Sequence, residues 1–99
     1  MIDDGRLDSA REFVTRFLRE EIDETTNPEL FGEDVLMFAV IKIDARAPSW
    51  ILQQLTDRRW PLSRRAELLC PMMTNYAEGY AILRDEAPNL VRHMPDPGR

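Results

Sequence analysis

The residues from Val35 to Ile43 constrain the fold of this chain more than any other segment. This run is almost entirely apolar and rich in β-branched residues, a pattern typical of either a buried strand or a helix at the centre of a core. A strand needs a partner strand, and no second strand-like run occurs in the sequence. The sequence therefore favours a central buried helix. The alternative is an α+β fold with residues 35–43 as a strand.

The clearest amphipathic pattern follows a polar lead-in of eight residues. Ser9 is suited to cap a helix, and Glu12 stands three positions later, as in a capping box. Apolar residues then recur at spacings of three and four: Ala10, Phe13, Val14, Phe17, Leu18 and Ile22. Two threonines and an asparagine before proline disfavour continuation, so we expect this helix to end near residue 25.

Prolines separate the remaining apolar segments, because proline inside a helix costs about 3 kcal/mol. Ser49 and Ser63 are suited to cap two further helices, and another helix is expected from about residue 73 to 87. These elements predict an all-α fold, a compact bundle of four to five helices, in one domain over residues 1–88. Residues 89–99, with two more prolines and a glycine, are expected to form a mobile C-terminal tail.

The chain carries few side chains suited to catalysis. Cys70 is the single cysteine and His93 the single histidine, so neither an internal disulfide nor four zinc ligands are available. Cys70 is expected to be a small buried hydrophobic residue, and His93 falls in the predicted tail. The four glycines are scattered, which excludes the common phosphate-binding loops. We therefore expect no catalytic, cofactor-binding or metal-binding residues, and a protein that is not an enzyme.

The composition is that expected of a cytoplasmic protein. The longest unbroken apolar run, residues 35–41, is far shorter than the roughly twenty residues of a membrane span, and the N-terminus has no signal-like segment. All but one of the 13 basic residues are arginine, which hints at a GC-rich bacterial or phage genome. The net charge of −5 argues against nucleic-acid binding over the whole surface.

One basic cluster stands out in this acidic chain. Arg58, Arg59, Arg64 and Arg65 bracket a turn that contains Trp60. One interpretation is a helix-turn-helix with these arginines placed for phosphates. The other is that they pair with the acidic N-terminal helix, within the fold or across a dimer, and that Trp60 is a core or interface anchor. These five residues are the predicted partner-binding site.

The absence of catalytic motifs leads to the functional expectation. We expect a small acidic protein-binding or regulatory module, similar in role to an adaptor or inhibitor, whose partner is another protein or a second copy of itself. Nucleic-acid binding through the arginine cluster is the first alternative. A small enzyme or enzyme subunit is the second. No membrane partner is expected.

Overall fold

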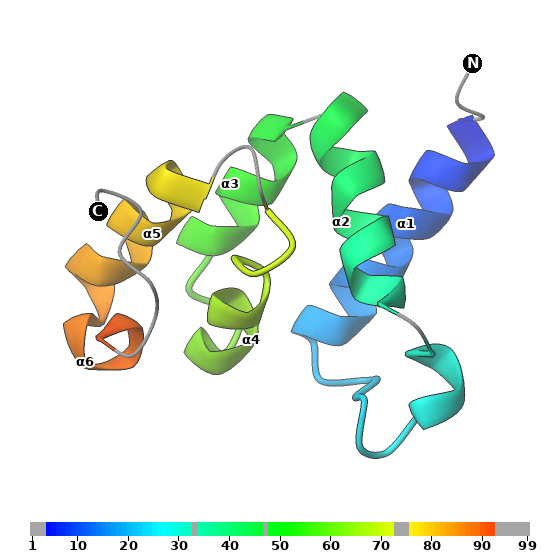
Figure 1. Cartoon of the computed structure of the whole chain (residues 1–99), viewed down its shortest axis with the longest axis horizontal. Coiled ribbons are helices and arrows are strands. Elements are labelled where there is room, and N and C mark those ends of the chain that lie inside the picture. The colour runs from blue at the N-terminus through cyan, green and yellow to red at the C-terminus, as the bar shows by residue number, and fades with distance from the viewer. Residues whose placement is uncertain (1–3, 33, 47, 73–75, 93–99) are drawn as a thin grey trace.

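The computed structural model describes residues 4–32, 34–46, 48–72 and 76–92, and this part of the chain consists of helices joined by turns and loops (Figure 1). The elements in chain order are α1 (Asp4–Leu18), the 3-10 helix η1 (Pro28–Leu30), α2 (Val35–Arg46), α3 (Pro48–Thr56), α4 (Leu62–Glu67), α5 (Tyr76–Glu86) and α6 (Pro88–Val91). No strand occurs within the described ranges. The all-α prediction is confirmed, and the alternative with a strand over residues 35–43 is excluded.

Helix α1 starts earlier than the capping pattern predicts. It begins at Asp4, so Ser9 lies inside the helix and the cap expected there is wrong. Leu7 gives the physical reason, because it precedes Ala10 by three positions and extends the same apolar stripe. Both residues pack on the core. Packing on the core therefore stabilises the first turn of α1. A helix start that is predicted from capping residues alone takes no account of such packing.

Helix α1 also ends earlier than predicted, at Leu18. Glu20 adopts a left-handed backbone conformation with a φ angle of 62°. Its amide donates to the carbonyl oxygen of Phe17 at 3.1 Å, and the next amide, of Glu21, donates to that of Arg16 at 2.9 Å. These paired bonds form a Schellman motif, which satisfies the last carbonyls of a helix. Helix α1 therefore stops at Leu18, well before the threonines that were expected to end it.

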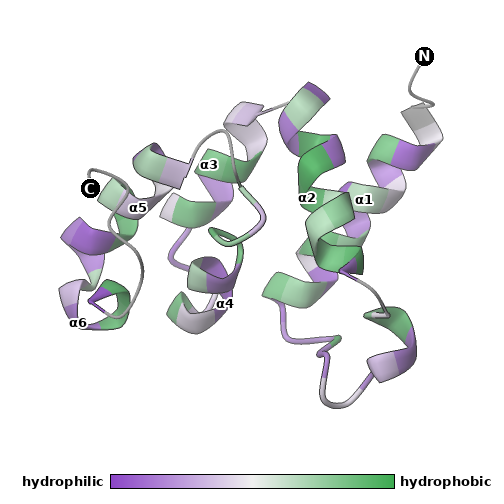
Figure 2. Ribbon diagram, viewed as in Figure 1, coloured by the Kyte–Doolittle hydropathy of each residue, from purple (hydrophilic) through white to green (hydrophobic). Residues whose placement is uncertain are grey.

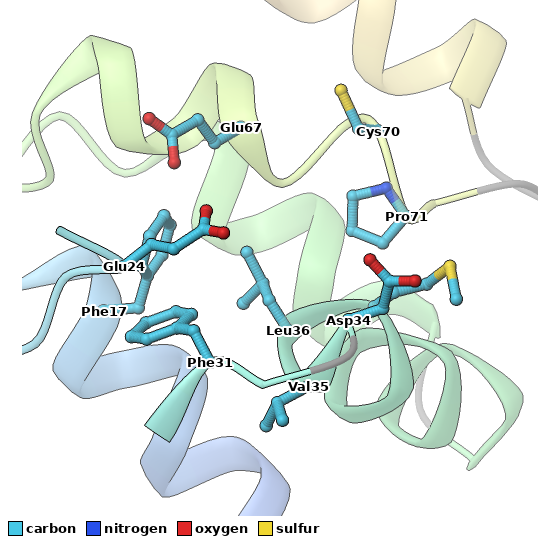
Figure 3. Close-up of a pocket in the computed structure, with 10 residues that line it drawn as sticks. Phe17, Glu24, Phe31, Asp34, Val35, Leu36, Glu67, Cys70 and Pro71 are labelled. Carbon is cyan, nitrogen blue, oxygen red and sulfur yellow. The ribbon is translucent and has the colours of Figure 1, made fainter. Parts of the chain in front are cut away.

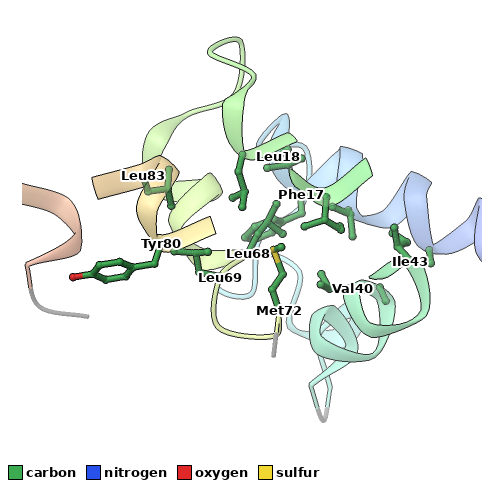
Figure 4. Close-up of a cluster of buried hydrophobic side chains, with 14 of the residues drawn as sticks. Phe17, Leu18, Val40, Ile43, Leu68, Leu69, Met72, Tyr80 and Leu83 are labelled. Carbon is green, nitrogen blue, oxygen red and sulfur yellow. The ribbon is translucent and has the colours of Figure 1, made fainter. Parts of the chain in front are cut away.

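The helices pack largely in chain order. Helix α1 packs on α2, α2 on α3, α3 on α5 and α5 on α6, while α4 contacts α1, α3 and α6 (Figure 1). Side chains from α1, α2, α3 and α5 and from the segment after α4 form one continuous core (Figure 4). Its fully buried members are Val14, Phe17, Leu18, Ile22, Val40, Ile43, Ile51, Leu55, Leu68, Leu69, Met72 and Leu83. Burying each such side chain contributes roughly 1.5–3 kcal/mol.

The apolar run that forms α2 is not surrounded by protein. Ala39, Val40 and Ile43 are buried, but Phe38 is 58% exposed and Ile41 43% exposed. The expectation of a central, fully buried helix is therefore wrong in part. Helix α2 packs on α1 as predicted and on α3, which leaves its remaining side uncovered. Figure 2 shows much of this helix in green, the colour of hydrophobic residues.

The predicted C-terminal tail begins inside the folded domain. Helix α6 occupies residues 88–91, and Val91 is buried. This short helix brings the described α-helices to six, one more than the upper prediction. Residues 93–99, including His93, lie outside the described residues. Within the described ranges, none of the helices combines the length and the apolar character that crossing a bilayer requires.

Candidate functional site

Arg65 of the predicted arginine cluster is built into the core. The residue is only 3% exposed. Its guanidinium donates to both carboxylate oxygens of Glu86 on α5, at 2.8 and 2.9 Å. It also donates to the carbonyl oxygens of Leu55 at 2.9 Å and Trp60 at 3.2 Å. Arg65 thus ties α4 to the end of α3, the following turn and the end of α5, and it holds the pKa of Glu86 below its usual value.

Arg64 precedes Arg65 on α4 and reaches different partners, in the segment after α1. Its guanidinium donates to a carboxylate oxygen of Asp23 and lies 3.9 Å from a carboxylate oxygen of Glu20. The same group is stacked over the Phe17 ring, with 4.8 Å to the ring centroid. A backbone hydrogen bond from Thr25, followed by Arg64 itself, lowers the pKa of Asp23. Arg64 therefore pairs with the acidic segment that follows α1, within the fold.

Trp60 and the two preceding arginines lie at the surface. The indole nitrogen of Trp60 donates to Gln54 at 2.8 Å, and the ring is partly buried against the core. The guanidinium carbons of Arg59 and Arg19 lie 5.1 and 5.9 Å from the ring centroid. Arg59 also pairs with Asp57 at 2.7 Å.

Only Arg58 and Arg59 of the cluster are well exposed, Arg58 with 85% of its side chain accessible. α3, a turn and α4 do follow one another as in a helix-turn-helix, but α4 has only six residues. Two of the four arginines, Arg64 and Arg65, bond carboxylates within the domain. The structure therefore leaves little free positive charge for phosphates. A partner contact by these five residues stays a prediction.

The uncovered side of α2 borders a groove that the sequence analysis did not anticipate. This groove lies between α1 and α2 and has a volume of about 450 Å³. Phe13, Val35 and Phe38 are among its apolar lining residues, and Arg6 and Lys42 are its cationic ones. The missed signal was the apolar character of α2 on all its sides, which indicates an exposed contact face when a chain is too small to surround the helix.

A second pocket, of about 310 Å³, lies on the other flank of the α2 N-terminus (Figure 3). Phe17, Phe31 and Leu36 give it an apolar lining. Phe31 is fixed there by tilted ring contacts with Phe13 and Phe17, at centroid distances of 5.2 and 6.1 Å. The chain turns back after α1, and the loop that follows supplies Phe31 to the pocket. Residues from α1, this loop, α2 and the end of α4 therefore line the pocket together.

Three carboxylates belong to the second pocket: Glu24, Asp34 and Glu67. The pKa of Glu67 is raised, chiefly by its partial burial, and the negative charges of Asp23 and Glu24 add to this while Arg64 opposes it. Within the described residues, no cation forms an ion pair with any of the three carboxylates. The pocket therefore combines an apolar lining with three carboxylates that form no ion pair with a described cation.

Cys70 also lines the second pocket, and it is exposed rather than buried as expected. The reason is that α4 ends at Glu67, so the thiol is carried by a turn before Pro71 and not by the inner face of a helix. Among the residues that the structure describes, no group of three or more His, Cys, Asp or Glu side chains is placed to hold a metal ion. Comparison of the chain with models of known families, with curated proteins and with solved structures found no match.

Proposed function

We propose that this chain is a non-catalytic protein-binding module that self-associates through the outer face of α2. The exposure of Phe38 beside a groove is the observation that carries the proposal. Single exposed apolar residues are common on monomers. Phe38 is a different case, because its exposed ring lines a groove together with Phe13, Val35 and Ala39.

A second copy of the chain fits this face. A two-fold interface uses the same patch on both subunits, so each patch must be complementary to itself. With the two-fold axis near Phe38 and the two α2 helices antiparallel, the Phe38 ring of each copy enters the groove of the other. Ile41, three positions after Phe38, then faces the second copy's Val35, three positions before it.

Charge supports the same arrangement. Asp34 lies four positions before Phe38 and Lys42 four positions after it, so the antiparallel pairing brings each Lys42 near the Asp34 of the other copy. Neither side chain has an ion-pair partner among the described residues. The face is formed by one helix and part of a second, so we expect a weak dimer with a dissociation constant in the micromolar range.

Light scattering after size-exclusion chromatography, at roughly 100 μM protein, tests this proposal. We expect the wild type to have the mass of a dimer and Phe38→Glu to have that of a folded monomer, checked by circular dichroism. Leu30→Glu is the matched control, because Leu30 is also a large exposed apolar residue but lies in η1, outside the α2 face. This variant should remain dimeric. A monomeric wild type, or a Phe38→Glu dimer of unchanged strength, contradicts the proposal.

A further inference from the structure

The pocket beside the α2 N-terminus is assembled from three separate segments. Glu24 comes from the loop after α1, Asp34 from the residue before α2, and Glu67 from the last residue of α4. These three residues line the same pocket as the apolar side chains of Phe31 and Leu36 (Figure 3). Such a pocket removes apolar surface of a ligand from water and offers negative charge at the rim.

Among the residues that the structure describes, no ion pair neutralises the carboxylates of this pocket. Arg64 is the cation that influences Glu67, but its guanidinium already bonds Asp23 and lies beside Glu20. Glu24 and Asp34 have no cationic partner in the described part of the chain. Glu24 and Asp34 are exposed, and desolvation affects Glu67, so an added cation interacts more strongly with Glu67 than it would with a carboxylate in open water.

We propose that this pocket binds an arginine side chain of a partner protein, presented next to an apolar residue. The inference rests on the proposed protein-binding function and names what a second surface of that module recognises. A guanidinium is preferred to an ammonium because its planar fork bonds carboxylates and its face stacks on aromatic rings. The fold already shows this chemistry once, where Arg64 stacks on Phe17, a ring that also lines the pocket.

The size of the pocket favours a side chain over a free ligand. Its volume of about 310 Å³ is at the lower end of the range for small-molecule sites, roughly 300–1,000 Å³. An arginine and one apolar neighbour occupy a space of this order.

The test is a titration of the full-length, ¹⁵N-labelled chain, followed by NMR, with the capped dipeptide N-acetyl-Leu-Arg-amide. Its matched control replaces arginine by citrulline, which has nearly the same shape but no charge. We expect the arginine peptide to shift the amide signals of Glu24, Leu36 and Glu67 and the citrulline peptide to bind several-fold more weakly. N-acetyl-Gly-Arg-amide should also bind more weakly, since it lacks the apolar neighbour.

Variants of the rim assign the effect to the pocket. Glu24→Gln and Glu67→Gln should each weaken binding of the arginine peptide about two- to fivefold. Glu78→Gln is the control, because Glu78 is an exposed acid at the start of α5 and does not line the pocket. The bound peptide should also lower the pKa of Glu67, which a purely apolar contact would not do.

The inference would be overturned by equal binding of the citrulline peptide, by binding of methylguanidinium as tight as that of the dipeptide, or by unchanged affinity in both rim variants. The Phe38→Glu chain separates this failure from failure of the proposed dimer. It lacks the α2 contact, which brings Lys42 of the second copy near Asp34, but it keeps the pocket. We therefore expect it to bind the arginine peptide at least as tightly as the wild type. Loss of peptide binding in that variant would place the peptide on the α2 face and contradict the pocket.

Discussion

Replacing Arg65 by alanine is the sharpest test of what holds this fold together. The substitution removes two hydrogen bonds to Glu86 and leaves the carbonyl oxygens of Leu55 and Trp60 without the donor they have in the native fold. Arg58 also approaches Glu86, at 3.7 Å, but its side chain is 85% exposed and cannot replace a buried bidentate partner.

The expected magnitude follows from the burial of the pair. Removing one partner of a buried ion pair destabilises a protein by about 3–5 kcal/mol. The side chain of Glu86 is 20% exposed, so water still reaches it and the lower end, about 3 kcal/mol, applies. Because a domain of this kind is stable by only about 5–15 kcal/mol, Arg65→Ala should remove a large share of the free energy of unfolding.

Urea denaturation followed by circular dichroism measures this loss. With an m-value of about 1.5–2 kcal/mol/M, the midpoint should fall by about 1.5–2 M. Arg59→Ala is the control, since the exposed pair of Arg59 with Asp57 should leave the midpoint nearly unchanged. An Arg65→Met, Glu86→Leu double variant should lose less than Arg65→Ala, because it buries no unpaired charge. A midpoint shift below roughly 0.5 M for Arg65→Ala would refute the reasoning.

The difference in the free energy of unfolding between wild type and Arg65→Ala should also depend on pH, which provides an independent check. Hydrogen bonds from Arg65 lower the pKa of Glu86 below its ordinary value of 4.5. A carboxyl whose pKa is lowered on folding contributes stability above its unfolded-state pKa and loses that contribution as the pH falls through its folded-state pKa. The gap between wild type and Arg65→Ala should therefore be full at pH 7 and narrow progressively below pH 4.5.

Two further substitutions test backbone and packing features by the same urea assay. Gly79→Ala should lower stability by about 1–2 kcal/mol although alanine favours helices, because the new Cβ would lie 2.4 Å from Leu69 and 2.8 Å from Leu55, both fully buried; a raised midpoint would show that these leucines can move aside. Glu20→Gly should raise stability by about 1 kcal/mol by relieving the left-handed conformation at the end of α1. A lowered midpoint would mean that the pairing of Glu20 with Arg64 outweighs this strain.

The fold class was accessible from the sequence because periodicity and the lack of a second strand-like run are properties of the chain itself. The ends of α1 were not, since both depend on tertiary structure. Leu7 helps to extend the helix by packing on the core. Glu20 stops it in a left-handed conformation that the residue type does not favour. A local signal such as a serine cap describes what a segment can do in isolation. In the folded chain, tertiary packing outweighs that signal and sets the ends of α1 elsewhere.

The arginine cluster illustrates a similar limit for the candidate site. Arg64 and Arg65 are adjacent in the sequence, yet they reach carboxylates of different segments, 41 and 21 residues away. No spacing rule connects a basic residue with partners at such distances. The sequence allowed these arginines either an external or an internal role, and the geometry uses two of the four inside the domain while leaving Arg58 and Arg59 exposed.

Helix α2 shows how chain length changes the meaning of an apolar pattern. A helix that is apolar on every side needs neighbours all round it, and a chain of 99 residues has few helices to provide them. Here two helices, α1 and α3, flank α2, and Phe38 and Ile41 remain exposed to water. Apolar residues that share an exposed face beside a groove are typical of contact surfaces, which is why we propose that a second copy covers this face. In a small domain, an apolar helix beyond the reach of its neighbours is therefore better explained as a contact surface than as the centre of the core.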